Sequence, residues 1–293
     1  MAKLAHFRIS AFGYAALSAV LLGMSPGWGH ADAGGTVVHP STTYLTTPDI
    51  GYKPPPAPDN DSNAGKAELR AVIAAQPQTD VARQDAFEDA AAYNYDDLLP
   101  RFSVAAGTSL SLQRRPILAH MLKVVLADVY PLVKAVKDAN TRKRPYKEDS
   151  KIIACETDYL PPSDSKSYPS NHAANGRAAA LLLSAVMPER EPLIRARGIQ
   201  YGDNRIVCGV HYRTDVEQGR AMSDAYFIKA TANTQFQQDL ACAKEEHQYS
   251  VAVRTGSRLP YSPTCAQLAG LYTVDAEAQV GAEIAQRRSF TPQ

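Results

Sequence analysis

Three short segments of the chain concentrate side chains that could carry chemistry. They read KDANTRKRP at residues 137–145, PSNH at 169–172 and NRIVCGVHYRTD at 204–215. From these segments we single out one lysine, two arginines, one serine, two histidines and one aspartate. The side chains of interest are Lys137, Arg144, Ser170, His172, Arg205, His211 and Asp215.

The cationic members of this set suit the binding of a phosphate monoester. Such a group carries up to two negative charges and gains charge on its equatorial oxygens in the transition state, so fixed positive donors must surround it. Arg144 and Arg205 offer planar forks that match phosphate oxygens, and Lys137 offers a point charge. Ser170 lies where a helix is expected to begin, and free backbone N–H groups favour an anion there.

The two histidines could supply a nucleophile and a proton donor. Attack on phosphorus needs one group and protonation of the leaving alkoxide needs another, so one histidine could serve each role. Asp215 follows His211 by four residues and could hold one ring nitrogen protonated while the other attacks. His211 and Asp215 could also form a helical metal-binding pair, but three nearby cations would oppose a metal dication.

Each of these side chains also has an ordinary structural interpretation. Lys137 suits a helix C-terminus, and Asp215 suits a helix N-terminus. Ser170 suits a plain helix N-cap. Arg144 and Arg205 could form surface ion pairs. Taken singly, each ordinary interpretation is favoured, so the hypothesis of phosphate chemistry depends on the combination.

The clearest element expected around these residues is a helix that begins at Pro116, a residue suited to the first helical position. Apolar residues recur every three or four positions as far as Val136 and form one stripe. Pro131 falls inside this stripe and predicts a kink. Lys137 lies near the end of the helix, and Arg144 follows in a loop.

The other segments also lie at expected helix boundaries. A helix beginning near Ser170 or His172 should run to Met187, where Pro188 stops it. Residues 214–217, Thr-Asp-Val-Glu, form a capping-box pattern that opens a helix reaching about residue 232. Further helical patterns cover about residues 80–95, 189–201 and 234–247, and no internal repeat is visible. We therefore expect one all-α domain.

The first 33 residues have the plan of a secretory signal peptide. Lys3 and Arg8 form a positive region, residues 9–24 are mostly apolar, and Ala31-Asp32-Ala33 predicts cleavage after Ala33. A membrane anchor is the alternative, but the run is shorter than the roughly 20 residues of a spanning helix. No later stretch comes close, so we expect an exported chain, periplasmic or secreted, with no membrane association after cleavage.

Composition limits the class of protein and the domain organisation that the chain can have. With 45% hydrophobic residues, 21% charged residues and a net charge of +1, the chain is typical of a soluble globular protein and not of a polybasic nucleic-acid binder. Residues 34–63 are rich in Gly, Pro, Ser, Thr and Asp and predict an extended arm before a helical domain of residues 64–250. The pattern weakens over the tail, residues 251–293.

The chain has four cysteines, Cys155, Cys208, Cys242 and Cys265. An even number in an exported chain indicates two disulfides, and three pairings are open. The spacings do not fit a zinc site, which needs close pairs of ligands. One pairing, Cys242 with Cys265, would tie the tail to the domain.

The three segments resemble the bacterial class A nonspecific acid phosphatases, of the superfamily of type 2 phosphatidic acid phosphatases and vanadium haloperoxidases. The family pattern is Lys-x6-Arg-Pro, Pro-Ser-Gly-His and Ser-Arg-x5-His-x3-Asp, and all spacings match over about residues 44–247. The resemblance implies an all-α helical-bundle domain without metal or cofactor. It also implies activity at acid pH on small phosphate monoesters, export, and homo-oligomers as a common state.

The resemblance also assigns roles. His211 would be the nucleophile that forms a phosphohistidine, His172 the general acid and then the base, and Asp215 the group that orients His211. Cys155 and Cys208 lie where family members carry cysteines, which favours their pairing and leaves Cys242 for Cys265. The residues expected to hold the phosphate are Lys137, Arg144, Ser170, Asn171 and Arg205.

Two positions depart from the family pattern: Asn171 replaces glycine and Asn204 replaces serine. Asparagine tolerates a left-handed conformation, so we expect the tight turn at Asn171 to survive, with its side chain narrowing the pocket or adding a donor. Phosphotransfer to an alcohol or nucleoside is one alternative, and a non-catalytic phosphate-binding protein is another. Lipid phosphatases usually carry several membrane spans, and the length and motif spacing favour a phosphatase over a haloperoxidase.

Overall fold

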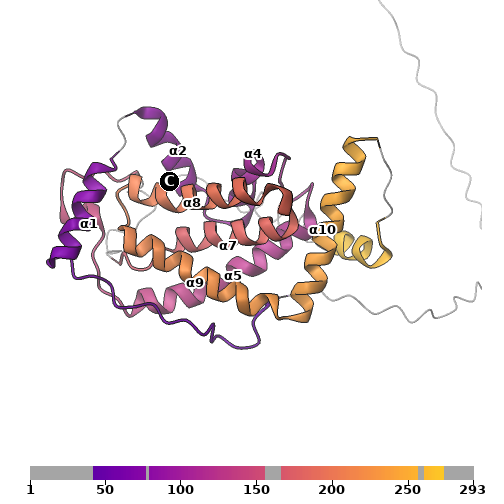
Figure 1. Cartoon of the computed structure of the whole chain (residues 1–293), viewed down its shortest axis with the longest axis horizontal. Helices are drawn as coiled ribbons and strands as arrows, with labels where there is room; N and C mark the ends of the chain where they lie inside the picture. Colours follow the sequence, from indigo (N-terminus) through magenta and orange to yellow (C-terminus); the bar gives the residue numbers. More distant parts are fainter. Residues whose placement is uncertain (1–41, 77–78, 156–165, 257–260, 274–293) are drawn as a thin grey trace, which may run out of the picture. The chain divides into compact units, whose positions relative to one another are not determined.

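A computed structural model of the chain describes residues 42–76, 79–155, 166–256 and 261–273, and its regular elements within these ranges are all helical (Figure 1). The expected all-α fold is confirmed, whereas the signal peptide predicted for residues 1–33 lies outside the described ranges. The elements are α1 (Asn63–Ala74), α2 (Asp80–Ala91), α3 (Tyr95–Leu98), η1 (Leu99–Phe102), α4 (Ser103–Ala106), α5 (Pro116–Asp138), α6 (Pro145–Glu148), α7 (Asn171–Val186), η2 (Pro188–Arg190), α8 (Glu191–Val207), α9 (Arg213–Thr231) and α10 (Thr234–Arg254), and residues 263–273 are helical too.

Helix α7 lies between α8 and α9 (Figure 1). Most of its residues are alanine or leucine and are buried. Gly198 of α8 shows how close the contact is, because a Cβ there would lie 2.5 Å from the Cβ of Ala180 and 2.9 Å from the carbonyl oxygen of Gly176. This close approach packs the middle of α8 against α7, and both helices carry candidate site residues.

The predicted helix at Pro116 is confirmed as α5, which buries eleven residues in the core. By length and composition α5 could cross a membrane, so the expectation that no later stretch comes close was wrong. However, 61% of its most apolar window is buried inside the fold. That burial is what the core helix of a globular protein requires.

The single helix predicted over residues 80–95 was wrong, because α2 ends at Ala91 and α3 begins at Tyr95. Backbone carbonyls at this break bind side chains of α7 and α8, which replace intrahelical partners. The pairs are His172 with Ala90 (2.9 Å), Tyr201 with Ala92 (2.6 Å) and Asn175 with Tyr93 (3.4 Å).

Three other predicted boundaries were also wrong. Helix α10 continues to Arg254, beyond the predicted end at about residue 247. Helix α8 extends to Val207, beyond the predicted end at residue 201. Helix α9 has its N-cap at Tyr212, whose backbone N–H donates to the Asp215 carboxylate at 2.9 Å. The hydroxyl of Thr214 does not cap the helix but donates to Glu68 of α1 at 2.5 Å.

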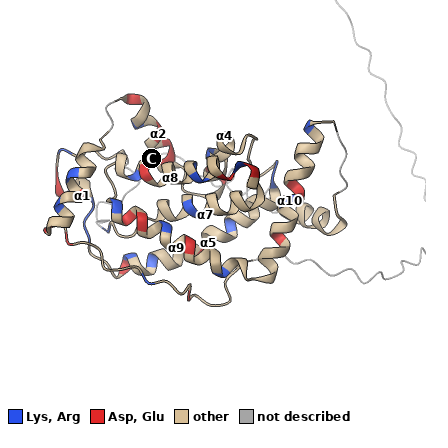
Figure 2. Cartoon of the chain, in the orientation of Figure 1, with Lys and Arg blue, Asp and Glu red and all other residues tan. Residues whose placement is uncertain are grey.

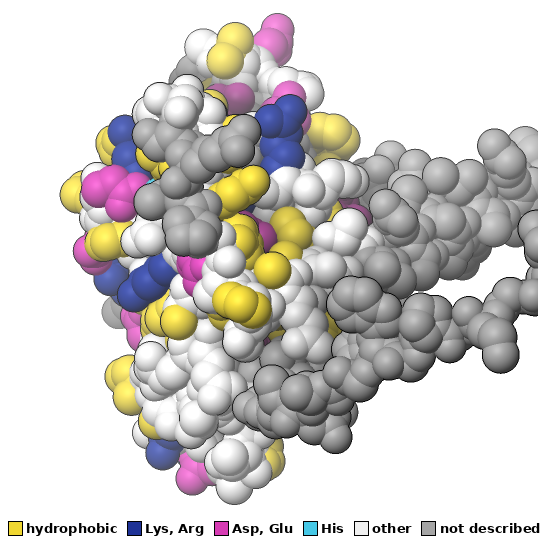
Figure 3. Space-filling view, turned by 90° about the vertical axis from the view of Figure 1, so that its right-hand side faces the viewer, with side chains coloured by type: hydrophobic (Ala, Val, Ile, Leu, Met, Phe, Trp, Pro, Cys, Tyr) yellow, Lys and Arg dark blue, Asp and Glu magenta, His cyan; other side chains and the backbone are white. Residues whose placement is uncertain are grey.

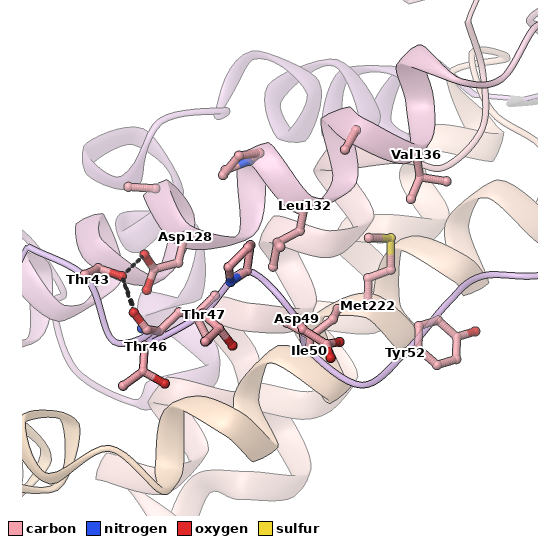
Figure 4. A pocket seen from close by; sticks show the side chains of 15 residues that line it. Thr43, Thr46, Thr47, Asp49, Ile50, Tyr52, Asp128, Leu132, Val136 and Met222 are labelled. Atoms are coloured by element: carbon pink, nitrogen blue, oxygen red, sulfur yellow. Dashed lines mark hydrogen bonds between the residues drawn. The ribbon is translucent and has the colours of Figure 1, made fainter.

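Residues 42–62 form no helix and pack along the domain. Tyr44 is buried, its N–H donates to Asp128 at 2.8 Å, and its hydroxyl donates to Asp239 at 2.8 Å. Thr43 also binds Asp128, beside a hollow of about 500 Å³ between this segment and α5 (Figure 4). None of the candidate site residues lines that hollow.

Both disulfides expected from the resemblance are present. Cys155 bonds to Cys208 at the end of α8, with 4.8 Å between Cα atoms. Cys242 of α10 bonds to Cys265, with 5.1 Å between Cα atoms. The second disulfide ties the helical residues 263–273 to the domain, while the rest of the tail lies outside the described ranges.

Charges of both signs are interspersed along the described helices (Figure 2), in agreement with the small net charge. On the face drawn in Figure 3, hydrophobic side chains lie among charged ones.

A buried carboxylate joins α10 to the start of α5. Glu246 accepts the backbone N–H groups of Ile117 (3.0 Å) and Leu118 (3.2 Å), two of the donors that a helix N-terminus leaves unpaired. Burial raises the pKa of Glu246 to about 7, although these N–H groups and Arg115 oppose the rise. Because its pKa is higher in the folded state, its stabilising contribution is complete below about pH 4.5 and is lost as the pH rises through 7.

Glu246→Gln stays neutral at every pH. We therefore expect the variant not to lose this stabilising contribution as the pH rises. The unfolding free energy of the variant relative to the native protein should rise between pH 4.5 and 7, by at most about 1.4 kcal/mol per pH unit. Urea unfolding at several pH values measures the difference, with exposed Glu217→Gln on α9 as the control. A constant difference between the native protein and Glu246→Gln would contradict this assignment.

Candidate active site

His211 is buried in the loop between α8 and α9, with one ring nitrogen toward a cation and the other toward a carboxylate. Its Nε2 lies 3.1 Å from Nη1 of Arg144, and its Nδ1 lies 3.3 Å from Oδ2 of Asp215. A guanidinium only donates hydrogen bonds, so Nε2 is the acceptor and Nδ1 carries the proton. This tautomer places the nitrogen that can attack beside a side chain that can hold phosphate.

A sharp turn at the end of α8 positions His211. Gly209 has φ +71°, and a Cβ there would lie 2.4 Å from Ile152. A left-handed glycine after the last helical residue is a common way to end a helix. The turn brings His211 just before α9, whose third residue is Asp215.

Asp215 connects all three segments, through its buried carboxylate and its backbone carbonyl. Its Oδ1 accepts from Arg142 at 2.9 Å, and its Oδ2 accepts from the hydroxyl of Ser167. The backbone carbonyl of Asp215 accepts the N–H of Ser170 at 2.9 Å. The carboxylate therefore lies where it could orient His211, as the spacing predicted, and it also joins several parts of the fold.

Arg142 is the main residue that the sequence interpretation missed. Its guanidinium is buried and donates to Glu68 of α1 at 2.6 Å and to Asn60 at 3.0 Å, besides Asp215. It also lies over the ring of Tyr212, 3.8 Å from the centroid. The sequence signalled it only as one of two further cations inside KDANTRKRP, Arg142 and Lys143, beside Lys137 and Arg144.

The three expected phosphate-binding cations lie around His211. Lys137, in the last turn of α5, donates to the carbonyl of Ser167 at 3.1 Å. Arg144 and Arg205 are both buried, so the interpretation as surface ion pairs was wrong. Burial lowers the pKa of His211 well below its usual value, and the charges of Arg144, Lys137 and Arg205 add to the effect.

His172 is the second residue of α7 and has the opposite tautomer. Its Nε2 lies 2.9 Å from the carbonyl oxygen of Ala90, so Nε2 carries the proton and Nδ1 is the acceptor. Burial lowers the pKa of His172 well below its usual value, followed by the charge of Arg205 and smaller effects of His211 and Arg144. Both histidines are therefore held neutral into the acid range.

Ser170 and Asn171 form the beginning of α7. The Ser170 hydroxyl accepts from the N–H of Ala173 at 3.3 Å, so its interpretation as a helix N-cap is confirmed. Asn171 is the first helical residue, and among the described residues only glycines have positive φ. The left-handed turn expected at Asn171 was therefore wrong, because helical geometry already presents its N–H at the helix N-terminus. Its Oδ1 is buried without a hydrogen-bond partner among the described residues.

The Arg142 network predicts a measurable loss of stability. Arg142→Met would leave the buried Asp215 and the half-buried Glu68 without their shared cation, and breaking a buried pair costs about 3–5 kcal/mol. Urea unfolding should show this loss. Lys143→Met, at a mostly exposed neighbour, should change the unfolding free energy by less than about 0.5 kcal/mol. Equal effects of the two variants would contradict a structural role for Arg142.

Phosphate binding should reverse the pKa shifts of the two histidines. A bound dianion offsets the surrounding positive charge, so saturation with inorganic phosphate should raise the pKa values of His211 and His172. Phosphate should then bind with proton uptake at pH values between the free and bound pKa values. Histidine NMR titration with and without phosphate measures this, with His247 of α10 as the internal control. Unchanged pKa values at saturation would contradict the proposed phosphate site.

Comparison with known proteins identifies the family of the chain. Residues 117–238 match the PAP2 superfamily. A non-specific acid phosphatase of Salmonella typhimurium is 31% identical over 201 residues, which are 67% of this chain and 78% of that protein. An acid phosphatase of Zymomonas mobilis is 30% identical over 168 residues, 57% of this chain and 62% of that protein. A non-specific acid phosphatase of Providencia stuartii is 33% identical over 147 residues, 50% of this chain and 59% of that protein. The chain therefore belongs to the acid phosphatases of the PAP2 superfamily.

Proposed function

We propose that the chain is an exported acid phosphatase that hydrolyses small phosphate monoesters through a phosphohistidine on His211, without a metal ion. The observation that carries the proposal is the contact between Arg144 and Nε2 of His211, with Nδ1 toward Asp215. A neutral nucleophile thus lies beside a cation suited to phosphate. The names of the related acid phosphatases support the same reaction.

In the first step, Nε2 of His211 attacks phosphorus and the bond to the leaving oxygen breaks. Lys137, Arg144 and Arg205 stabilise the charge on the other oxygens, together with N–H groups at the start of α7. Protonated His172 gives its proton to the leaving oxygen, so an alcohol departs. Asp215 stabilises the positive charge that develops on His211.

In the second step, water replaces the enzyme on phosphorus. Neutral His172 accepts a proton from water, the water oxygen bonds to phosphorus, and the phosphorus–nitrogen bond breaks. Inorganic phosphate leaves, His211 returns to its neutral form, and His172 is again protonated. An alcohol or nucleoside in place of this water would make the same enzyme a phosphotransferase.

Activity at acid pH follows from the charge around the histidines. The lowered pKa of His211 keeps the nucleophile neutral in acid, where an ordinary histidine would be protonated. Bound phosphate raises the pKa of His172 by its negative charge, so the general acid gains its proton together with the substrate. Both effects favour turnover below neutral pH.

Export is proposed from the amino-terminal segment of the sequence, and the two disulfides support it because such bonds persist in oxidising compartments. A homo-oligomer remains a prediction from the family resemblance.

Substitution of each histidine tests the mechanism. His211→Ala should abolish turnover of p-nitrophenyl phosphate between pH 4 and 8 in excess chelator, because it removes the nucleophile. His172→Ala should slow alkyl phosphates more than aryl phosphates, since good leaving groups need less protonation. Circular dichroism confirms folding. Turnover that vanishes with chelator and returns with zinc would contradict the metal-free mechanism, and retained activity in His211→Ala would contradict the nucleophile.

Replacement of Asn171 tests whether its side chain impairs turnover. Asn171→Gly should keep or raise kcat, because the backbone N–H at the start of α7 remains while the side chain is removed. Steady-state kinetics together with isothermal titration of phosphate measure both properties. Phosphate binding without turnover in the native chain, and turnover in Asn171→Gly, would favour a phosphate-binding protein. Complete loss in the variant would assign the asparagine a function of its own.

A further inference from the structure

The orientation of the His172 imidazole depends on one backbone carbonyl. The carbonyl of Ala90 lies in the last turn of α2, where carbonyl groups lack intrahelical partners, and it accepts from Nε2 of His172 at 2.9 Å. A neutral imidazole has one N–H, so this bond leaves Nδ1 to exchange a proton with the leaving group. Tyr93, just after α2, also packs on the imidazole with 4.8 Å between ring centroids.

The residue before Ala90 anchors this end of α2. Asp89 is 1% exposed, and its carboxylate accepts four hydrogen bonds from η1 and α8. Two guanidinium groups and one amide supply them, so the buried negative charge is paired. The donors are Arg101 Nε (2.9 Å), Arg197 Nη1 (3.0 Å), Arg197 Nη2, and Asn204 Nδ2 (2.6 Å).

This anchor gives a physical reason for one departure from the family pattern. Asn204 stands directly before Arg205, where the pattern has serine. An asparagine side chain reaches one atom further than a serine hydroxyl, and here it supplies the 2.6 Å hydrogen bond to Asp89. The carboxylate therefore joins the end of α2 to the turn of α8 that carries a phosphate-binding residue.

We propose that Asp89 is a positioning residue that fixes the tautomer and the orientation of the His172 imidazole. Arg101, Arg197 and Asn204 hold its carboxylate in place. The inference rests on the proposed role of His172 as general acid. Asp89 acts through the Ala90 carbonyl: its hydrogen bonds hold α2 against α8, and α8 packs along α7, which carries His172. Each histidine then has its own orienting acceptor, Asp215 for His211 and the Ala90 carbonyl for His172.

The kinetic test compares Asp89→Asn with Asp85→Asn, an exposed control on the same helix. The rate of leaving-group release in the first turnover is measured for 2-glycerol phosphate and p-nitrophenyl phosphate. Asp89→Asn should slow the alkyl ester about 10- to 100-fold, a part of the roughly 10²–10⁴-fold that general acid catalysis contributes, and the aryl ester less than about threefold. KM should change little, and Asp85→Asn should behave as the native protein. Equal losses on both esters would overturn the proposal.

The spectroscopic test is independent of turnover. Nitrogen-15 NMR of histidine should show His172 with its proton on Nε2 in the native protein and in Asp85→Asn, and a mixture of tautomers in Asp89→Asn. Asn204→Ala keeps the ion pairs of Arg101 and Arg197 with Asp89, and should shift the His172 tautomers in the same direction to a smaller extent. This variant therefore tests the proposal if Asp89→Asn does not fold. A single Nε2–H tautomer in every folded variant would overturn the proposal. If His172→Ala itself slows both esters equally, the acid role is wrong, while the NMR result still tests the anchor.

Discussion

The buried carboxylate of Asp215 is the interaction on which the rest of the structure depends. An uncompensated carboxylate in the interior is costly, so each of its oxygens needs donors. Arg142 supplies one, and Ser167, His211 and the Tyr212 backbone supply the others. These donors come from different parts of the chain, so satisfying the charge also assembles the site.

The negative charge of Asp215 also explains why neighbouring cations have different roles. Arg142 faces Asp215 and Glu68 and stabilises the fold, whereas Arg144, two residues later, contacts the ring nitrogen of His211. The cations around His211 and His172 disfavour the protonated form of each histidine. The substrate therefore supplies the negative charge that the site lacks, and this couples phosphate binding to protonation of the general acid.

Much of the site could be predicted from the sequence, because its groups lie at helix boundaries with fixed spacings. The helix at Pro116 and the cap at Ser170 have local causes, a restricted φ and a side-chain hydrogen bond. The pairing of Arg142 with Asp215 could not be predicted, because the partners are 73 residues apart and neighbouring cations offer the same charge. The break after α2 was missed for a similar reason, since its carbonyls bind side chains of distant helices.

In the proposed mechanism, Nε2 of His211 receives the phosphoryl group. Rapid mixing with a phosphorus-labelled aryl phosphate, quenching in alkali and peptide mapping would locate the covalent phosphate, and phosphorus–nitrogen NMR would identify the bonded nitrogen. We expect one phosphoryl group, on Nε2 of His211. Phosphate on Nδ1, phosphate on His172, or product formation without any phosphoenzyme would contradict it.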